Sequence, residues 1–349
     1  MIVHLFPKEK FTIPFIKFIN KNFNINEHLF IIYGSNIAYN EDEVKKYTNI
    51  IYVNKKNKRN FKYLIKYIYR ADKIIIHGLL SNKLSLILFF QPWIFRRSYW
   101  VIWGGDLYEY KLKVKYSKFN INEKIRSIII KNVNGLITQV EGDYKLAKKW
   151  YGAKGKYYYS FVYPSNLYKN IDLSKNKKED NYIYIQVGNS ASYTNNHIEI
   201  FNKLIKYKSS NIKIICPLSY GENEYRESII KYGEDIFGDK FIPIIDFLPL
   251  DKYLNILSKI DIAIFNHKRQ QAIGNITTLI GLGKKVYVRS DISTWEFCKS
   301  HNLKVFDSSS NLNNLLEKLS ELDTENNKLN IKKYFSEVKL KKDLEKIFK

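Results

Sequence analysis

Short apolar runs alternate with segments of helical periodicity along almost the whole chain, a pattern typical of βα units. In the first half these runs lie at Leu29–Tyr33, Ile50–Val53, Lys73–His77, Tyr99–Trp103, Gly135–Val140 and Tyr157–Phe161. In the second half they lie at Tyr182–Val187, Ile212–Cys216, Phe241–Ile245, Asp261–Phe265, Val286–Val288 and Lys304–Phe306. Two such series in tandem predict an α/β protein with two doubly wound parallel sheets.

The domain organisation follows from the break between the two series. The stretch Asp172–Asn181 is charged, rich in turn formers and without apolar period, as is typical of a domain boundary. We expect an N-terminal domain at 1–165, a C-terminal domain at 166–330 and a basic amphipathic helix at 331–349. Two Rossmann-like domains that face each other across a cleft form the GT-B architecture of many glycosyltransferases, although a fold alone does not assign a function.

The most apolar stretch of the chain is Leu84–Phe95. It is too short to cross a bilayer, which needs about 20 residues, and Pro92 interrupts it. It is either a core helix that ends at the proline or a contact with one face of a membrane. The second interpretation rests on the mixture of aromatic and basic residues that follows, which is found at membrane interfaces: Trp93, Arg96, Arg97, Tyr99 and Trp100.

The formal charge of +24 is concentrated in the N-terminal half. Residues 1–165 hold 29 Lys and Arg against 11 Asp and Glu, a net of +18, whereas residues 166–349 hold 29 against 23, a net of +6. The first half therefore suits a polyanion such as an anionic membrane surface or a lipid diphosphate. Motifs typical of nucleic-acid binding are missing, so we expect no nucleic-acid partner.

The cysteines and the first residues bear on the compartment. Cys216 and Cys298 lie in apolar surroundings outside any C-x-x-C motif, which favours free thiols in a reducing compartment. The first ten residues lack a basic segment followed by an apolar one, so we expect no signal peptide. Both observations favour the cytoplasm.

One candidate ligand site lies in the loop that follows the run Ile260–Phe265. This loop carries His267, Lys268, Arg269, Gln270 and Gln271, and an apolar, helix-like segment from Gly274 to Gly283 follows it. In open α/β sheets, ligands bind at the carboxyl ends of strands, where helix N-termini offer unpaired N–H groups. Cationic and amide side chains at this place suit a diphosphate.

A second candidate segment, Val187–His197, follows the first strand of the second domain. Gly188 allows close approach of the backbone, and Asn189 and Ser190 are able to donate to phosphate or ribose oxygens. Taken alone this is a capped βα turn. Taken with Arg269 and Gln270 at another strand end of the same sheet, it favours a ligand site.

In the first domain, His77 ends one strand and Asp106 follows the end of another. Both would meet the cleft, and one of them could take the proton from an attacking hydroxyl, since His and Asp are ordinary general bases. The pair Gly104-Gly105 before the acid opens the backbone where a ligand can approach. The sequence leaves open which of the two is the base.

The sequence does not contain the common motifs for nucleotide binding or metal binding. No G-x-G-x-x-G, P-loop or D-x-D sequence occurs, and the six histidines show no metal-type spacing. We therefore expect a metal-independent reaction without a cofactor, in which helix N-termini and cations stabilise a leaving diphosphate.

These segments resemble glycosyltransferase family 56, the TDP-Fuc4NAc:lipid II Fuc4NAc transferases of enterobacterial common antigen synthesis. The matching stretches keep the order of the family and cover nearly the whole chain. They are His77-Gly78, Trp100–Glu109, Gly142-Asp143, Tyr163-Pro164, Val187–Ser190, Asn196-His197, Arg269–Gln271, Ile273-Gly274 and Trp295.

The resemblance implies a GT-B hexosyltransferase that moves a Fuc4NAc-like deoxyamino sugar from a dTDP-sugar to an undecaprenyl-diphosphate-linked saccharide in surface polysaccharide synthesis. The N-terminal domain would take this acceptor through Trp103, Gly105 and Glu109, at the cytoplasmic face of the inner membrane as a peripheral protein. The C-terminal domain would take the donor through Gly188, Asn189, Ser190, His197, Arg269, Gln270, Gln271 and Gly274.

The chain also departs from the family pattern. Ala191 stands where the family has glycine, and Asn275 and Ile276 follow Gly274. Arginines expected beside Gly142 and after Pro164 are replaced by Glu141 and within Ser165-Asn166. The lost arginines imply an acceptor less acidic than one that bears a uronic acid.

The sequence also leaves open a non-catalytic function. A protein that docks on an anionic membrane and binds a nucleotide sugar or glycan within a polysaccharide assembly complex would share the basic first half and the candidate phosphate site. It would need no acid opposite that site, whereas the chain has Asp106.

Overall fold

The computed structural model describes residues 1–34, 46–53, 58–116, 120–169, 178 and 180–349. The chain divides into two compact units: Met1–Leu167 with Glu337–Lys349, and Tyr168–Ser336. We call them unit 1 and unit 2. The stretch Asp172–Asn181, expected as the domain boundary, lies largely outside the described residues.

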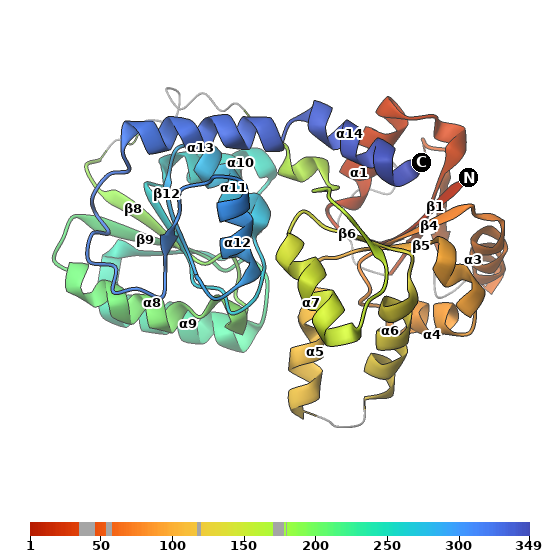
Figure 1. Cartoon of the computed structure of the whole chain (residues 1–349). Coiled ribbons are helices and arrows are strands. Elements are labelled where there is room, and N and C mark those ends of the chain that lie inside the picture. Colours follow the sequence, from red (N-terminus) through yellow and green to blue (C-terminus); the bar gives the residue numbers. More distant parts are fainter. Residues whose placement is uncertain (35–45, 54–57, 117–119, 170–177, 179) are drawn as a thin grey trace. The chain divides into compact units, whose positions relative to one another are not determined.

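Unit 1 is built on a seven-stranded parallel sheet of order β3-β2-β1-β4-β5-β6-β7 (Figure 1). Its strands are β1 (Ile2–Pro7), β2 (His28–Tyr33), β3 (Ile50–Val53), β4 (Lys73–His77), β5 (Ser98–Val101), β6 (Gly135–Ile137) and β7 (Lys156–Tyr158). Its helices are α1 (Thr12–Asn22), α3 (Lys58–Arg70), α4 (Asn82–Phe89), α5 (Gly105–Tyr116), α6 (Ile121–Asn132), α7 (Glu141–Tyr151) and α14 (Glu337–Phe348), with short 3-10 helices η1 (Ile25–Glu27), η2 (Pro92–Arg97) and η3 (Pro164–Asn166).

Strand β1 was not among the predicted strands, although it lies in the interior of the sheet, between β2 and β4. It pairs in parallel with β2 on one side, where Val3 lies opposite Leu29, and with β4 on the other, where Val3 lies opposite Ile74. The chain order reverses between β1 and β4. Their carboxyl ends therefore form the topological switch point, the usual ligand crevice of an open α/β sheet.

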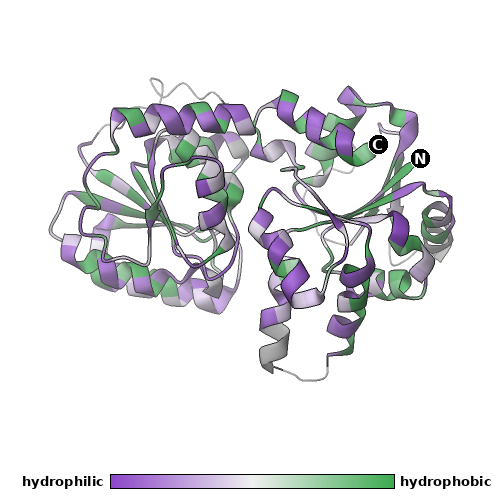
Figure 2. Ribbon diagram, viewed as in Figure 1, coloured by the Kyte–Doolittle hydropathy of each residue, from purple (hydrophilic) through white to green (hydrophobic). Residues whose placement is uncertain are grey.

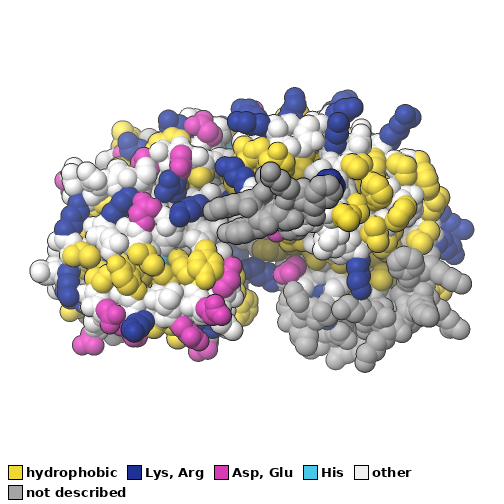
Figure 3. Space-filling view, turned by 90° about the horizontal axis from the view of Figure 1, so that it is seen from below, with side chains coloured by type: hydrophobic (Ala, Val, Ile, Leu, Met, Phe, Trp, Pro, Cys, Tyr) yellow, Lys and Arg dark blue, Asp and Glu magenta, His cyan; other side chains and the backbone are white. Residues whose placement is uncertain are grey.

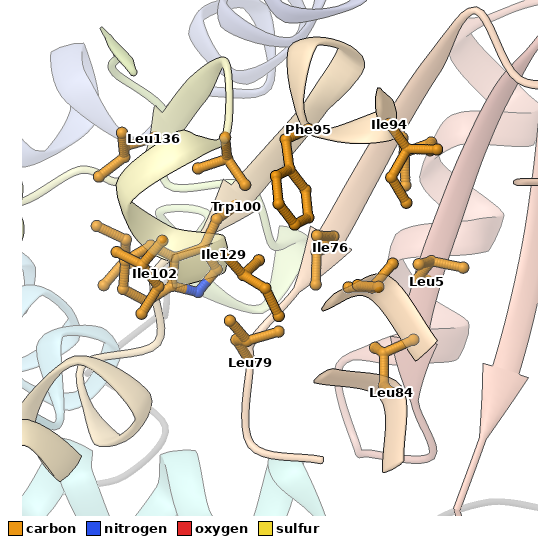
Figure 4. Close-up of a cluster of buried hydrophobic side chains, with 14 of the residues drawn as sticks. Leu5, Ile76, Leu79, Leu84, Ile94, Phe95, Trp100, Ile102, Ile129 and Leu136 are labelled. Atoms are coloured by element: carbon orange, nitrogen blue, oxygen red, sulfur yellow. The ribbon is translucent and has the colours of Figure 1, made fainter. Parts of the chain in front are cut away.

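The core of unit 1 is apolar and continuous from the sheet into its helices. Figure 4 shows Leu5 of β1 and Ile76 of β4 in one cluster with Trp100 of β5 and Ile129 of α6. Trp100 is fully buried, and burying a large apolar side chain contributes about 1.5–3 kcal/mol. The parallel strands are buried on both faces, which explains their unbroken Ile and Val runs.

Unit 2 is built on a six-stranded parallel sheet of order β10-β9-β8-β11-β12-β13. Its strands are β8 (Ile183–Val187), β9 (Ile212–Pro217), β10 (Phe241–Ile244), β11 (Ile262–Phe265), β12 (Lys285–Val288) and β13 (Phe306–Asp307). Its helices are α8 (His197–Leu204), α9 (Asn223–Phe237), α10 (Leu250–Lys259), α11 (Ile273–Gly281), α12 (Ser293–Ser300) and α13 (Glu321–Tyr334), with short 3-10 helices η5 (Tyr193–Asn195), η6 (Ile205–Tyr207) and η7 (Gly238–Lys240). Figure 2 shows hydrophobic residues gathered on the strands and hydrophilic ones on the outer helix faces.

The end of the chain differs from the single basic helix expected at 331–349. Helix α13 ends at Tyr334, and α14 begins at Glu337 as part of unit 1. Phe348 of α14 packs its ring 4.6 Å from that of His28, between ring centroids. The apolar side of α14 therefore packs against unit 1.

Candidate functional site

The predicted donor residues lie at the switch point of unit 2. The chain order of its sheet reverses between β8 and β11, so the loops that follow these two strands meet at one edge. Gly188 and Asn189 follow β8, and Arg269 and Gln271 follow β11. The two segments singled out in the sequence are thus neighbours in space.

Hydrogen bonds join the two loops directly. Gln271 Nε2 donates to Asn189 Oδ1 at 3.3 Å, and Thr194 Oγ1 donates to Gln271 Oε1 at 2.8 Å. The backbone N–H of Lys268 donates to the Thr194 carbonyl at 2.8 Å. Asn189 also donates from Nδ2 to the Tyr220 hydroxyl at 2.6 Å, which ties in the loop after β9. Three loops therefore hold one another in place without a ligand, as preorganised sites require.

Asn195 is the buried centre of this arrangement. Its Oδ1 accepts from the Asn189 backbone N–H at 2.9 Å and contacts His267 Nε2 at 3.1 Å, while its Nδ2 donates to Ser190 Oγ at 3.0 Å. Gly188 has no room for a side chain, because a Cβ there would lie 2.8 Å from Asn195 Oδ1. The sequence analysis did not single out Asn195 within Val187–His197. Its role depends on a contact with the loop after β11, which spacing alone does not reveal.

Helix α11 begins at this edge without a side-chain cap. Its N-cap residue, Ala272, has a left-handed backbone (φ 59°) and no side-chain hydrogen bond to cap the helix. The first N–H groups of a helix lack intrahelical partners and carry a partial positive charge, so an uncapped start suits an anion. Gly274 lies in this first turn, and Arg269 and Gln270 immediately precede it. The arrangement is able to hold a diphosphate with backbone N–H groups, an amide and a guanidinium.

His197, predicted to bind the donor, lies beneath the loop instead. It is fully buried, its Nδ1 lies 3.1 Å from the Tyr225 hydroxyl, and its Nε2 would lie 2.4 Å from a Cβ on Gly188. Burial lowers the pKa of His197 to about 3, so the ring is neutral at physiological pH. Its geometry fits support of the Gly188 turn rather than contact with a ligand.

Asp106, predicted as a general base, caps loops in unit 1. Its Oδ2 accepts from the Leu79 N–H at 2.9 Å and from Trp100 Nε1 at 2.7 Å. Its Oδ1 accepts from the N–H groups of Trp103 and Leu107, both at 2.9 Å. Four donors saturate the carboxylate, which is fully buried. Burial raises the pKa of Asp106 while the N–H donors oppose the rise, and no lone pair faces solvent for an acceptor hydroxyl.

His77 is one link in a buried chain of rings. Its Nε2 lies 3.1 Å from His4 Nδ1, whose ring in turn reaches His28 Nδ1 from Nε2 at 3.0 Å. On the other side His77 Nδ1 lies 2.9 Å from the Tyr163 hydroxyl, which accepts from Trp103 Nε1 at 2.6 Å. Burial lowers the pKa of His77, so it is neutral, and both of its nitrogens are engaged. This geometry fits a structural role better than that of a base.

The three residues predicted to contact an acceptor differ in their surroundings. Trp103 is partly exposed at the carboxyl edge of the sheet, where its ring lies 2.9 Å from the position of a Cβ on Gly78. Gly105 has open space around its Cβ position, and Glu109 is partly exposed one turn into α5. Gly78 rather than Gly105 is the glycine that close packing requires, with φ +73°.

The loop after β1 was missed because β1 itself was missed. It carries Glu9 at the switch point of unit 1, and Thr12 fixes it: Thr12 Oγ1 accepts from the Glu9 N–H at 3.1 Å and donates to the Pro7 carbonyl at 2.9 Å. Phe11 of the same loop stacks on Tyr163, with ring centroids 5.2 Å apart. The signal was present, since Ile2–Pro7 is an apolar run followed by charged residues.

A buried arginine also escaped the sequence analysis. Arg126 of α6 donates to the carbonyls of Leu79 at 2.6 Å and Asp106 at 2.7 Å, and it pairs with Glu123 at 2.8 Å. It therefore clamps the loops after β4 and β5, which carry the predicted acceptor residues. Within the described ranges there is no group of three or more His, Cys, Asp or Glu side chains that could hold a metal ion.

Solved structures similar to this chain span its whole length. Anabaena HepE, in complex with UDP and glucose, is 12% identical with a TM-score of 0.72 and covers 99% of each chain. Sucrose-phosphate synthase from Thermosynechococcus elongatus is 10% identical with a TM-score of 0.72 and covers 100% of this chain and 98% of its own. A glycosyltransferase from Rickettsia africae is 14% identical with a TM-score of 0.70, and the match covers 99% of this chain and 97% of the Rickettsia chain. These likenesses confirm the predicted GT-B fold.

The family model described as 4-alpha-L-fucosyltransferase, glycosyl transferase group 56, matches residues 18–336. The match confirms the resemblance drawn from the ordered motifs and covers both units. The chain therefore belongs to glycosyltransferase group 56 and is a glycosyltransferase.

Proposed function

We propose that this glycosyltransferase moves a Fuc4NAc-like deoxyamino sugar from a dTDP-sugar to an undecaprenyl-diphosphate-linked saccharide in surface polysaccharide synthesis. The observation that carries the donor half is the linked pair of loops after β8 and β11, with the uncapped start of α11 between them. The UDP and UDP-glucose complexes of Anabaena HepE, which has the same fold, support a nucleotide-sugar donor.

The proposed role of unit 2 in the reaction is to stabilise the leaving nucleoside diphosphate. As the acceptor oxygen bonds to the anomeric carbon, the bond from that carbon to the diphosphate breaks and negative charge grows on the phosphate oxygens. Arg269 and the first N–H groups of α11 offset that charge, and Asn189 with Gln271 fixes the loop that carries them.

The acceptor half rests on unit 1. Its switch point offers Trp103, whose partly exposed indole suits a sugar face. It also offers Glu9, a partly exposed carboxylate on a fixed loop, placed to take the proton that the acceptor hydroxyl loses as its oxygen bonds to the anomeric carbon. We infer that Asp106 and His77 hold this edge in shape and do not exchange the proton. Family membership and the net charge of +18 over residues 1–165 support a lipid-linked acceptor and a peripheral place on the inner membrane.

A transfer assay tests this reaction. Purified protein is incubated with dTDP-Fuc4NAc or its UDP counterpart and a short-chain polyprenyl-diphosphate disaccharide, and the lipid product is weighed by mass spectrometry. We expect a mass gain of one deoxyamino sugar with the dTDP donor. The proposal would be contradicted if only the UDP-sugar served as donor, or if free sugar were released without a lipid product.

A further inference from the structure

Helix α4 and η2 turn a set of large apolar side chains outward. Leu86 is 46% exposed, Phe90 67% and Trp93 54%, whereas Leu84 and Leu88 on the opposite side of α4 are buried in the core. Leu86 and Phe90 are four residues apart and therefore lie on one helical stripe. The segment Leu84–Phe95 was expected to be either a core helix or a membrane contact. In the structure the inner side of α4 belongs to the core, whereas its outer side exposes apolar side chains.

The neighbouring helices extend this face. The ring of Tyr69 on α3 lies 6.0 Å from that of Trp93, between centroids, and Tyr69 is 48% exposed. Helix α6 packs beside α4 and exposes Ile121 by 69% and Ile128 by 43%. Figure 3 shows hydrophobic side chains gathered on this part of unit 1 with Lys and Arg side chains near them. We call the outer side of α3, α4, η2 and α6 the docking face.

The exposed charges of the described part of the docking face are mainly positive. Residues 63–97 contain six Lys and Arg but a single acid, Asp72, whose carboxylate pairs with the amino group of Met1. The acid of α6, Glu123, is buried against Arg126. The exposed cations are Lys66, Arg70, Lys83, Arg96, Lys124 and Lys131.

We propose that the docking face rests on an anionic lipid surface. Aromatic and aliphatic side chains beside Lys and Arg are the pattern of proteins that lie in a membrane interface, and the cations are attracted to anionic lipid headgroups. The core of a protein–protein interface is depleted in charged residues, Lys among them, which disfavours a protein partner. Exposed Leu and Ile side chains would gain nothing from a nucleic acid.

The position of this face suits the proposed function, on which its biological role rests. Helix α4 begins directly after the β4 loop, and Leu80 in that loop is 51% exposed at the carboxyl edge of the sheet. A membrane beneath α4 would therefore bring lipid headgroups next to the switch point of unit 1. Within the described ranges, no helix is long and apolar enough to cross a bilayer.

Vesicle flotation tests the docking face. Full-length protein is mixed with vesicles of phosphatidylethanolamine and phosphatidylglycerol, and the floated fraction is compared for wild type and the double variant Phe90→Ser/Trp93→Ser. The matched control is Leu322→Ser/Leu329→Ser, which removes two side chains of α13 in unit 2 that are 73% and 64% exposed. We expect the first variant to lose at least tenfold in vesicle partitioning, the control to float like wild type, and high salt to weaken wild-type binding.

Two further readouts keep the outcome clear. Thermal melting checks that both variants fold, and transfer to a water-soluble acceptor analogue should match wild type in the Phe90→Ser/Trp93→Ser protein. Unchanged flotation of that variant would overturn the proposal. So would a wild type that forms dimers without binding vesicles while the variant is monomeric, because the face would then join two copies. Flotation of a wild type that transfers no sugar would instead contradict the proposed reaction alone.

Discussion

Gln271 and Asn189 are joined side chain to side chain, with Gln271 Nε2 donating to Asn189 Oδ1 at 3.3 Å across the switch point of unit 2. The two residues are far apart in sequence and follow different strands, β11 and β8. Their contact holds together the two loops that the sequence singled out separately. The uncapped start of α11 lies on the same edge, and this combination supports the proposed diphosphate site.

Substitution of Gly188 tests how closely the donor loop is built. A Cβ at this position would lie 2.4 Å from His197 Nε2, and the backbone has φ +69°. We expect Gly188→Ala to weaken dTDP binding at least tenfold, measured by calorimetry. Gly238→Ala is the matched control: it shares the positive φ, +54°, but meets nothing within 4 Å. It should cost about 1–3 kcal/mol of stability, because a φ of +54° with a ψ of −134° suits glycine, and leave affinity unchanged. Equal affinity in the two variants would show that the Gly188 turn is not part of the site.

Asp106→Asn separates a structural carboxylate from a catalytic one. Asparagine keeps one acceptor oxygen and turns an NH₂ group toward two of the four N–H donors, so we expect a loss of about 3 kcal/mol in the free energy of unfolding. Urea unfolding followed by tryptophan fluorescence reports this, since Trp93, Trp100, Trp103 and Trp150 all lie in unit 1.

The control for Asp106 is Glu141→Gln, which breaks an exposed pair with Lys145 at 2.9 Å on α7. We expect that variant to change stability by no more than about 0.5 kcal/mol. An Asp106→Asn protein that unfolds at the wild-type urea concentration but turns over far more slowly would restore the interpretation of Asp106 as the base.

The buried pair of Arg126 and Glu123 makes a third prediction. Arg126→Met removes the clamp on the Leu79 and Asp106 carbonyls and leaves Glu123 as an unpaired buried charge, which should cost about 3–5 kcal/mol. The double variant Glu123→Gln/Arg126→Met removes that charge and should regain part of the loss. If the double variant is less stable than the single one, the loss came from packing and not from the orphaned carboxylate.

Buried histidines make stability depend on pH. Burial lowers the pKa of His28 to about 4 and that of His197 to about 3, from 6.5. Each neutral ring contributes stability that is complete above pH 6.5 and is lost as the pH falls toward the folded pKa, because only the unfolded chain then binds the proton.

The free energy of unfolding should therefore be level from about pH 8 to 7 and fall between about pH 6.5 and 5, by up to about 1.4 kcal/mol per histidine and pH unit. The melting temperature should fall with it. His197→Asn removes one titrating ring, so its melting temperature should fall less steeply. A melting temperature that stays constant down to pH 5 would show that these rings are accessible to protons in the folded protein.

The sheet architecture was predictable because buried parallel strands read as unbroken apolar runs. Twelve of the strands coincide with the predicted runs in order, and the missing one, β1, has the same signal at Ile2–Pro7. The prediction that the loops of Gly188 and Arg269 contribute to one site needed only strand ends, because these loops follow β8 and β11, which are neighbours in the sheet.

The roles of single polar residues were not predictable in the same way. The spacing correctly places Asp106 near a strand end, but it does not show that four N–H groups converge on its carboxylate. His77 likewise ends a strand, yet its partners His4 and His28 come from two other strands. Satisfaction of buried polar groups depends on contacts between distant segments, and one sequence does not reveal them.

The most direct test of the donor site is calorimetric titration of the full-length protein with dTDP, beside UDP and GDP. We predict selective binding of dTDP that falls at least tenfold in Arg269→Ala, at the carboxyl end of β11. Lys259→Ala, an exposed cation just before the amino end of the same strand, should bind as wild type does. Failure to bind any nucleotide, or equal affinity in the wild type and Arg269→Ala, would contradict the account.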